Sequence, residues 1–336
     1  MSEPKKPGGA SAPPLKVAVA GLGTVGAGVL KVLRDNAKAI AARAGRPIVV
    51  TAVSARNRDK DRGVSLEGLA WFDDPVAMAR EADADVVVEL IGGANGPAKA
   101  SVLAAIRAGR GVVTANKALL AHHATELSAA AEAAGVPLAF EAAVAGGIPI
   151  VKGLREGLAA NRIDRVVGIL NGTCNYILTT MRESGRDFGD VLADAQALGY
   201  AEADPSFDID GVDAAHKLSL LTSLAFGTQV DFANVHVEGI RHITALDIGY
   251  ADELGFRIKL LGIARRTESG IEQRVHPCMV PKASAIGAVE GVFNAVIVEG
   301  DAVGQVVFCG RGAGEGPTAS AVVADLVDIA SGRAGA

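Results

Sequence analysis

The sequence predicts an α/β protein, in which a Rossmann-type doubly wound parallel sheet is followed by an α+β domain. The chain has 336 residues, enough for two domains that each bury a core of their own. Strand-like apolar runs alternate with helix-like segments up to about residue 145, and this rhythm is lost from about residue 146. A glycine-rich turn, GLGTVG at 21–26, joins the first strand to the first helix. These observations predict a first domain over residues 15–145 and a second domain after it.

The composition is that of a packed globular protein. Hydrophobic residues make up 49% of the chain and the mean hydropathy is +0.29. No apolar stretch approaches the ~20 residues that a membrane span needs, so no membrane partner is expected. The net charge of −5, the pI near 5.7 and the 4% of aromatic residues argue against nucleic acid as a partner. The expected partner is therefore a small molecule.

The cysteine pattern and the N-terminal residues bear on the cellular compartment of the protein. Cys174, Cys278 and Cys309 are widely spaced and form no CxxC pair, which fits a reducing compartment and offers no metal framework. Residues 1–14 are rich in proline, glycine and alanine and lack the apolar centre of a secretory signal. We therefore expect a disordered N-terminal tail and a cytoplasmic enzyme.

The segment at 15–36 combines a strand, the glycine-rich turn and a helix, which is the context that GxGxxG requires for dinucleotide binding. Gly21 permits the tight turn, Gly23 lets the backbone approach a pyrophosphate, and Gly26 allows the helix to pack closely on the strand. Free N–H groups at the N-terminus of the helix would bind the pyrophosphate. A glycine-rich turn without a ligand is the less favoured interpretation.

Further strand and helix segments alternate along the first half at 47–55, 83–93, 97–109, 111–119, 122–134 and 136–144. Alternation of this kind gives parallel strands that are joined by helical crossovers. The sequence therefore predicts a parallel, doubly wound sheet for the first domain.

The end of the second strand is expected to set the cofactor preference. An NAD enzyme usually offers an acidic residue there for the ribose 2′-hydroxyl. Here the strand continues into SARNRDKDR at 54–62, and Arg56 and Arg58 precede the first acidic residue, Asp59. Guanidinium groups pair well with phosphate, so NADP is favoured over NAD. The alternative is that these charges are solvated and that NAD also fits.

TANKALL at 114–120 follows another strand of the sheet. Asn116 and Lys117 should therefore lie at the carboxyl edge, where open α/β sheets bind their ligands. A lone lysine is usually solvated, but this position makes a functional role for Lys117 a serious alternative.

The second half begins with a loop that enters a helix at 146–158, followed by a strand, a turn and a helix at 163–181. Thr173 is the expected N-cap of that last helix. Cys174 follows it, and a thiol at a helix N-terminus is acidified and could be a nucleophile. A small buried residue is the favoured interpretation of Cys174, because no histidine lies near it in sequence.

An acidic stretch at 199–217, GYAEADPSFDIDGVDAAHK, follows an amphipathic helix at 188–199. A calcium loop is excluded, because the EF-hand frame places Lys217 where a bidentate glutamate belongs. In a helical frame Asp213 and Lys217 lie at i and i+4 on one face. Apolar residues on the other faces of 212–227 predict that this helix is buried, and buried charges must be paired or must act on a ligand.

The motifs in this order resemble the homoserine dehydrogenase family over about residues 15–330. The most specific match is the pattern of Ala195, GYAE at 199–202, Pro205, Asp208, Ile209, Gly211, Asp213 and Lys217. Further motifs occur in the family's order and approximate spacing: GLGTVG, ELIGG, TANKALLA, FEAAVAGGIPI, NGTCNYI and GRGAGEGPTASAVVADL. Such enzymes interconvert L-homoserine and L-aspartate 4-semialdehyde with NAD(P), a step in threonine, methionine and isoleucine biosynthesis.

The resemblance implies roles for individual residues. The cofactor would be held by Gly21, Gly23, Thr24, Val25, Gly26, Arg56, Asn116, Lys117, Gly314 and Glu315. The homoserine pocket would be formed by Gly172, Thr173, Tyr200, Glu202, Asp208, Asp213 and Lys217. A monovalent cation, typically sodium, would be held by Glu141 and by the backbone carbonyl groups of Val144, Gly146 and Ile148.

The chemistry of the substrate agrees with these residues. Homoserine is a zwitterion, so its ammonium group needs carboxylates and its carboxylate needs a cation. Oxidation of the alcohol releases one proton, which a lysine can accept if burial lowers its pKa from ~10.4. Lys217, oriented by Asp213, is the first candidate for this role, and Lys117 is the competitor or polarises the carbonyl oxygen. The sequence alone cannot rank the two.

Two other functions are weighed against this one. An acylating semialdehyde dehydrogenase would use Cys174 as its thiol nucleophile. A nucleotide-sensing protein on a Rossmann scaffold would need neither the paired carboxylates nor the buried lysine.

The resemblance also implies an architecture. A catalytic and dimerisation domain would cover 146–309, a segment at 310–336 would return to the nucleotide-binding domain, and the chain would form a homodimer. The sequence ends at Ala336 without the C-terminal ACT domain that many members carry. Threonine feedback through such a domain is therefore not expected.

Overall fold

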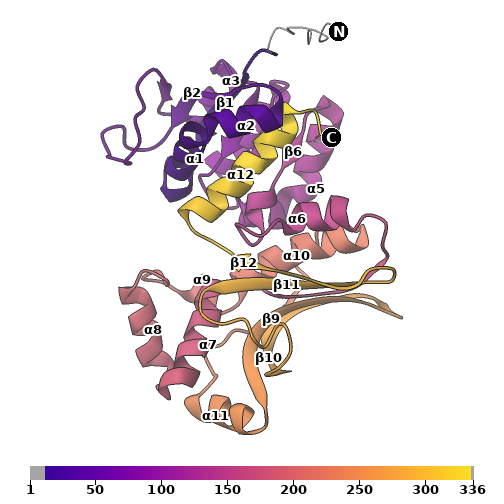
Figure 1. Ribbon diagram of the computed structural model, residues 1–336. Coiled ribbons are helices and arrows are strands. Elements are labelled where there is room, and N and C mark those ends of the chain that lie inside the picture. Colours follow the sequence, from indigo (N-terminus) through magenta and orange to yellow (C-terminus); the bar gives the residue numbers. More distant parts are fainter. Residues whose placement is uncertain (1–11, 334–336) are drawn as a thin grey trace, which may run out of the picture.

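The computed structural model describes residues 12–333, which form two lobes connected by several chain crossings (Figure 1). The predicted disordered tail at 1–14 lies almost entirely outside these residues and stays a prediction. No helix within residues 12–333 is both long and apolar enough to cross a membrane.

The first lobe contains the predicted doubly wound parallel sheet, which is confirmed. Its strands are β1 (Leu15–Ala20), β2 (Ile48–Ser54), β3 (Ala70–Phe72), β4 (Val86–Glu89), β5 (Gly111–Thr114) and β6 (Leu138–Ala139). All of them pair in parallel, in the order β3-β2-β1-β4-β5-β6. This is the strand order of dinucleotide-binding folds, and it places a crevice beyond the carboxyl ends of β1 and β4.

Helices cover both faces of this sheet. They are α1 (Thr24–Asp35), α2 (Ala37–Ala44), α3 (Pro75–Glu81), α4 (Pro97–Arg107) and α5 (Lys117–Ala134). Helix α5 begins five residues before the predicted 122, because the Asn116 side chain caps it by accepting a hydrogen bond from Leu119 N. The predicted strand at 136–144 is mostly wrong: β6 has two residues, and a 3₁₀ turn, η1 (Glu141–Ala143), replaces the rest.

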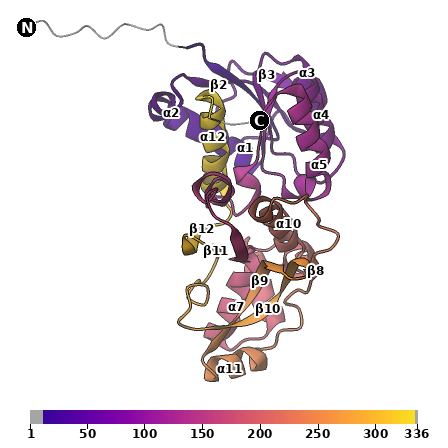
Figure 2. The ribbon, with the colours of Figure 1, turned by 90° about the vertical axis from the view of Figure 1, so that its right-hand side faces the viewer.

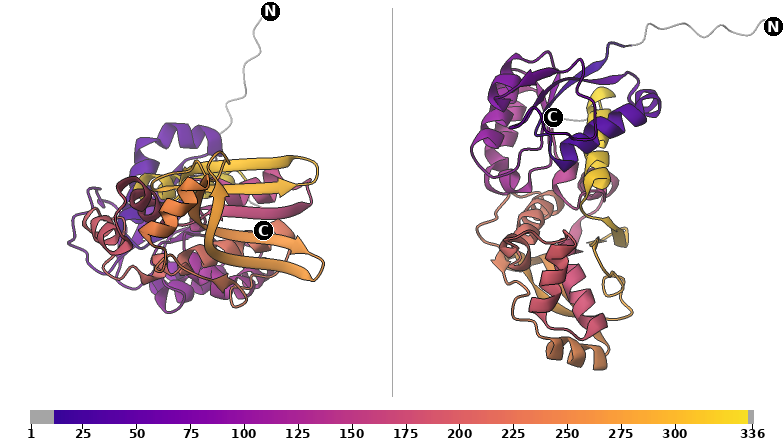
Figure 3. Two further views of the ribbon diagram at one scale, coloured as in Figure 1. Left: turned by 90° about the horizontal axis from the view of Figure 1, so that it is seen from below. Right: turned by 90° about the vertical axis from the view of Figure 1, so that its left-hand side faces the viewer.

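The second lobe is built on a mixed sheet, which Figure 3 shows from below. Its strands are β7 (Ile163–Ile169), β8 (His236–Val237), β9 (Phe256–Thr267), β10 (Gly270–Pro281), β11 (Phe293–Gly300) and β12 (Gly304–Arg311). They lie in the order β12-β11-β7-β9-β10-β8 and pair antiparallel except for β10 with β8. The predicted strand at 163–169 is thus the centre of a sheet that the sequence patterns did not otherwise reveal.

The helices of the second lobe are α7 (Gly172–Ser184), α8 (Phe188–Ala197), α9 (Ser206–Ile209), α10 (Val212–Phe226) and α11 (Ala245–Glu253). A short helix, α6 (Ile150–Lys152), runs into a π-helical turn, η2 (Gly153–Gly157), where the chain crosses between the lobes. Helix α10 is buried along most of its length, as predicted, and it packs against α5 of the first lobe as well as β7, β9 and β10 of the second (Figure 2).

The C-terminal helix α12 (Glu315–Ala330) returns to the first lobe. It packs against α1 and α2 (Figure 1). Its residues Ala319, Val322 and Leu326 share a core with residues of β1 and α1. The link from β12 into α12 therefore passes the junction of the lobes, close to the carboxyl edge of the parallel sheet.

Candidate active site

A cavity of about 410 Å³ lies where the two lobes meet. Its wall is made by the N-terminal ends of α5, α7 and α10, by the turn at 311–314, and by Gly199, Tyr200, Asp208, Val292 and Asn294. Lys117 lines it from the carboxyl edge of the parallel sheet, as its position after β5 predicts. The size and the polar lining suit a small, charged molecule.

Asp213 is the centre of an ionic cluster in this cavity. It is 2% exposed, and its two carboxylate oxygens pair with two different lysines. Oδ1 lies 2.9 Å from Nζ of Lys117 on α5, and Oδ2 lies 2.6 Å from Nζ of Lys217 on α10. Lys217 also donates a hydrogen bond of 2.8 Å to the carbonyl oxygen of Leu170. The structure thus brings together one lysine from each lobe around a shared carboxylate.

The pKa values of this cluster are shifted in opposite directions. Burial lowers the pKa of Lys217, and the nearby Asp213 only partly offsets that effect. Asp213 instead raises the pKa of Lys117, which keeps that ammonium group charged. Burial alone would raise the pKa of Asp213, but the two lysines outweigh it and hold this pKa well below its usual range. Lys217 is therefore the group in the cluster whose proton is more easily exchanged.

The N-terminus of α7 faces the same cavity. Its N-cap is Asn171, whose Oδ1 accepts from Cys174 N at 2.8 Å, so the prediction of Thr173 as the cap is wrong. Asn171 Nδ2 donates to Asp208 and Asp213, at 2.8 and 2.9 Å, and fixes both acids against the helix end. Asn171 is a site residue that was not predicted, although asparagine before a helix is a strong capping signal.

Gly172 and Thr173 are the first residues of α7 and line the cavity. The hydroxyl group of Thr173 donates to the carbonyl oxygen of Tyr200 at 2.7 Å, which attaches the 199–208 segment to the helix. The Tyr200 ring lies 4.8 Å from the ring of Tyr176 and is partly exposed. Helix N-terminal N–H groups favour an anion at this end of the cavity.

Asp208 supplies a second carboxylate, and its pKa is raised by burial and by the neighbouring Asp213. Glu202 is exposed on the loop before α9 and is not among the residues that line the cavity, although its charge contributes to the raised pKa of Lys117. Of these two predicted substrate residues, the structure therefore places Asp208 in the cavity wall and Glu202 outside it.

The glycine-rich turn between β1 and α1 has the backbone geometry that dinucleotide sites require. Gly21 has φ +99, and a β-carbon there would lie 2.5 Å from the carbonyl oxygen of Leu90. A β-carbon on Gly26 would lie 2.0 Å from the carbonyl oxygen of Gly21. Above Gly23 the space is open, and the exposed Thr24, followed by Val25, begins α1 without a side-chain cap. The free N–H groups of this helix end can therefore bind a phosphate.

Basic side chains surround the loop after β2. Arg56 and Arg58 are exposed, and Arg58 and Arg62 both stand over the Trp71 ring, at 5.8 and 5.7 Å from its centroid. Arg62 also donates to the carbonyl oxygen of Leu22 at 3.2 Å, which connects this loop to the glycine-rich turn. Arg62 was not predicted as a site residue, because nothing in the local sequence pattern indicates its contact with Leu22.

Two family models match the chain. One, described as homoserine dehydrogenase, covers residues 149–327, and the other, the NAD binding domain of homoserine dehydrogenase, covers 21–141. The chain belongs to the homoserine dehydrogenase family. It is 57% identical to a homoserine dehydrogenase of Pseudomonas aeruginosa over 94% of this chain and 72% of that protein. A homoserine dehydrogenase of Neisseria gonorrhoeae is 53% identical over the same shares.

Solved structures agree with the sequence relatives. A homoserine dehydrogenase from Thiobacillus denitrificans matches with a TM-score of 0.92 and 55% identity, over 95% of this chain and 74% of that one. A putative homoserine dehydrogenase from Archaeoglobus fulgidus matches with a TM-score of 0.84 and 36% identity, over 94% and 99%. Homoserine dehydrogenase is an NAD(P)-dependent oxidoreductase of a CH–OH group, so this chain interconverts L-homoserine and L-aspartate 4-semialdehyde.

Other predicted cofactor residues of this homoserine dehydrogenase are held by the protein itself. The Asn116 carboxamide caps α5 and donates to Gly93 O at 2.8 Å, so its hydrogen-bonding groups are occupied. Glu315 pairs with Lys31 at 2.8 Å and packs on Gly28 of α1. Gly314 lines the substrate cavity and is the N-cap of α12, with φ 124. The backbone of this turn, rather than the Glu315 side chain, is thus directed toward the cavity.

The turn at 141–148, where a monovalent cation was predicted, has an unusual backbone. Ala145 and Gly146 have φ values of 53 and 43 in succession. Glu141 is buried beside this turn, and its carboxylate accepts from Val151 N at 3.0 Å and from Lys152 N at 2.8 Å. Burial raises the pKa of Glu141 to about 7. A buried carboxylate beside a turn rich in carbonyl groups fits a small cation, whose charge would offset that burial.

Cys174 cannot serve as a thiol nucleophile in this site. It is fully buried, and its Sγ donates to the carbonyl oxygen of Asp208 at 3.2 Å. Burial, together with Asp208, raises the pKa of Cys174 well above its ordinary value. The alternative of an acylating semialdehyde dehydrogenase is therefore wrong, in agreement with the family assignment.

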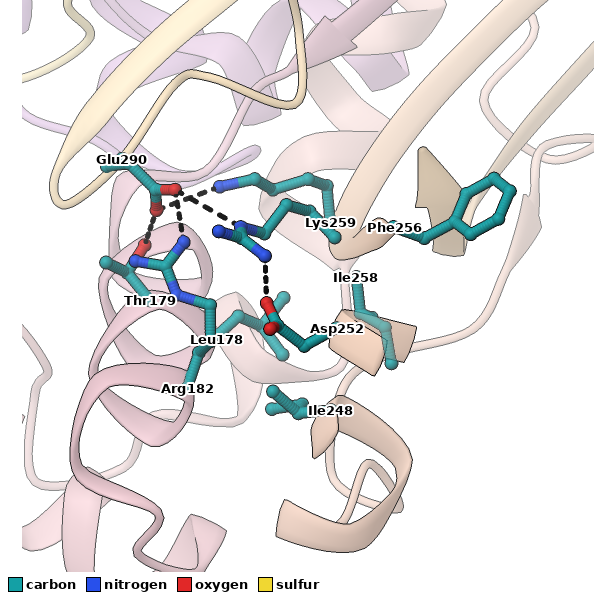
Figure 4. A pocket seen from close by; sticks show the side chains of 10 residues that line it. Leu178, Thr179, Arg182, Ile248, Asp252, Phe256, Ile258, Lys259 and Glu290 are labelled. Atoms are coloured by element: carbon teal, nitrogen blue, oxygen red, sulfur yellow. Dashed lines mark hydrogen bonds and ion pairs between the residues drawn. The ribbon is translucent and has the colours of Figure 1, made fainter. Parts of the chain in front are cut away.

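A second, much smaller pocket lies behind α7 and is shown in Figure 4. It is filled by an ionic network in which Glu290 pairs with Arg182 at 2.6 Å and with the buried Lys259 at 3.3 Å. Thr179 donates to the same carboxylate at 2.9 Å. These polar groups satisfy one another's hydrogen-bonding capacity. The network therefore attaches the 282–292 loop, which contains Glu290, to α7 and β9.

Proposed function

We propose that Lys217 is the acid–base group of the homoserine dehydrogenase reaction. The observation that carries this proposal is the burial of Lys217, which lowers its pKa while Asp213 and the Leu170 carbonyl hold its Nζ in the cavity. In the oxidation of L-homoserine, the neutral amine accepts the hydroxyl proton as the carbonyl group forms. In the reverse direction the ammonium form returns that proton to the alkoxide oxygen.

Lys117 has a different role in this proposal. Its raised pKa keeps it cationic, so it stabilises negative charge on the reacting oxygen rather than exchanging a proton. Asp213 orients both amines through its two oxygens. Bound NADP supplies the hydride acceptor at the carboxyl edge of the parallel sheet, held at the turn from Gly21 to Gly26.

The two charged groups of the substrate share the α-carbon, so they are assigned to neighbouring parts of the cavity around the N-terminus of α7. Asp208 and Glu202 bind the α-ammonium group, with Tyr200 beside them. The α-carboxylate lies at the N-terminus of α7, where Gly172 and Thr173 line the cavity. The assignment rests on charge complementarity between a zwitterion and the polar cavity lining.

We also propose the finer architecture. The nucleotide-binding domain spans 15–145, the catalytic domain 146–309, and the segment 310–336 returns to the first domain. A homodimer would form through the second sheet, on the face opposite α7 and α10. That face carries the apolar side chains of Val167, Ile297 and Val307, of which Val307 is 43% exposed.

The cofactor preference is proposed to be NADP, bound with its 2′-phosphate near Arg56. An Arg56→Asp variant should lower the ratio of kcat/KM for NADPH to that for NADH by ~10–100-fold, because a charge-assisted hydrogen bond is replaced by repulsion. Initial rates with each cofactor at saturating L-aspartate 4-semialdehyde measure this ratio. Arg43→Asp makes the same charge change at the far end of β2, on α2, and should leave the ratio unchanged.

An unchanged ratio in Arg56→Asp would place the 2′-phosphate elsewhere. Arg62 would then be the next residue to test, because it contacts the glycine-rich turn.

A monovalent cation, sodium, is proposed to bind Glu141 and the carbonyl groups of Val144, Gly146 and Ile148. The pKa of Glu141 is about 7 in the folded state and lies near 4.5 when unfolded, so without sodium stability falls as pH rises from 4.5 to 7. Above that range the buried carboxylate is charged, and sodium should stabilise the fold most. The melting temperature should therefore rise with NaCl at pH 8 and respond little at pH 5.

The control for ionic strength is an equal concentration of tetramethylammonium chloride, whose cation is too large for the turn. Glu141→Gln should lose both the pH dependence and the sodium response. A sodium response that survives in this variant contradicts the proposed site.

A further inference from the structure

Asn294 is a polar residue of the substrate cavity that the proposed mechanism does not use. It is the second residue of β11, lines the cavity and is only 1% exposed. Its backbone pairs with Gly310 in the sheet, and within residues 12–333 no side-chain hydrogen bond involves its carboxamide. The carboxamide instead faces the cavity, where it is available to hydrogen-bond a ligand.

The position of this carboxamide is enforced by two glycines. A β-carbon on Gly312 would lie 2.2 Å from both Cγ and Nδ2 of Asn294. A β-carbon on Gly172 would lie 3.4 Å from Asn294 Oδ1 and 2.7 Å from the carbonyl oxygen of Val292. The side chain therefore lies between the first residue of α7 and the turn that leads into α12.

The backbone before Asn294 is anchored to α7. Asn175 Nδ2 donates to the carbonyl oxygens of Gly291 and Phe293, at 2.9 and 3.2 Å. One turn further along the helix, Thr179 and Arg182 bind Glu290, which also pairs with Lys259 (Figure 4). Helix α7 is thus bonded to the segment that presents Asn294 at two places along its length.

The surroundings decide which part of the substrate this carboxamide meets. The acidic side chains of the cavity, Asp208 and Asp213, are hydrogen-bonded to the N-cap Asn171, and Asp213 is also paired with Lys117 and Lys217. Asn294 Oδ1 lies near Gly172, which begins α7, and Asn294 Nδ2 lies near Gly312, from where it can donate two hydrogen bonds to a group in the cavity. Neutral donors beside a helix N-terminus bind a carboxylate without adding a charge that would compete for Asp213.

We propose that Asn294 is a specificity residue that donates a hydrogen bond to the α-carboxylate of the amino-acid substrate, beside the N-terminus of α7. This inference rests on the proposed placement of the substrate in this cavity. It explains why residue 312 must be glycine and why the 289–294 segment is tied so closely to α7.

The test is the near-isosteric variant Asn294→Asp, which replaces a donor by an anion. Its kcat/KM for L-homoserine should fall by ~100-fold or more, mostly through KM, while the KM for NADPH stays within about threefold. L-Homoserinamide carries a neutral amide in place of the carboxylate and can donate to the new side chain. Discrimination between the two ligands should therefore fall, measured by turnover or by the competitive inhibition constant of homoserinamide.

Two further variants separate this role from a structural one. Gly312→Ala should displace the carboxamide and raise the KM for L-homoserine in the same way, whereas Gly189→Ala on α8, where an added β-carbon meets open space, should not. Equal losses with L-homoserine and homoserinamide in Asn294→Asp, at an unchanged melting temperature, would overturn the proposal. Failure of the proposed chemistry would instead appear as full turnover in Lys217 variants, which this experiment does not involve.

Discussion

A Lys217→Ala variant should lose ~10²–10⁴-fold in kcat, while its affinity for NADPH stays close to that of the wild type. Lys217 is buried in the substrate cavity, contacts Asp213 and Leu170, and lies on a helix that does not form the glycine-rich turn. Its loss therefore removes the proton acceptor without disturbing the phosphate site. The rate of NADPH oxidation with L-aspartate 4-semialdehyde and a direct NADPH titration measure the two quantities separately.

The arginine variants of the two lysines make this test sharper. A guanidinium group remains charged at all working pH values, so Lys217→Arg should be nearly as inactive as Lys217→Ala. Lys117→Arg keeps the charge that the proposed role of Lys117 requires and should retain far more activity. Small alkylamines should partly restore Lys217→Ala, with a rate that rises with the concentration of neutral amine. Turnover near that of the wild type in Lys217→Arg would reverse the roles assigned to the two lysines.

The sequence reveals those parts of the site that lie within one element. The ion pair between Asp213 and Lys217 could be predicted from the sequence, because the two residues occupy i and i+4 of a helix whose other faces are apolar. The dinucleotide-binding turn could also be predicted from the sequence, because Gly21 and Gly26 are each required by a specific close contact. In both cases the local sequence pattern, together with the apolar residues around it, is sufficient to predict the site residues.

The sequence does not reveal what the tertiary structure brings together. Lys117 comes from the other lobe, and only the packing of α5 on α10 places it against Asp213. Asn294 lies at the start of a sheet strand with no motif of its own, and its position depends on contacts with α7. Asn171 rather than Thr173 caps α7, because its side chain also binds Asp208 and Asp213. Long-range contacts therefore determine which residue caps α7 and which residues reach the site, and the local sequence does not distinguish these alternatives.

The second large effect is expected from Asp213→Asn. This change leaves Lys217 buried without its counter-ion, so the free energy of unfolding should fall by ~3–5 kcal/mol at neutral pH. The folded-state pKa of Asp213 is held below the unfolded value of 3.8, so its stabilisation is present above that pH and is lost as pH falls below it. Denaturant unfolding at pH 7 and pH 3 should therefore show a smaller difference between variant and wild type at the lower pH.

Asp210→Asn is the matched control, because Asp210 precedes the same helix and pairs with Arg241 in an exposed ion pair. Its effect on stability should be under ~1 kcal/mol.

The Asp213→Asn variant should also change the pH dependence of catalysis. Asp213 raises the pKa of Lys217, so its removal should lower that pKa and shift the acidic limb of L-homoserine oxidation to lower pH, with a reduced kcat. A reduced kcat with an unshifted limb would mean that Asp213 only positions the lysines, and that another group sets the proton-transfer step.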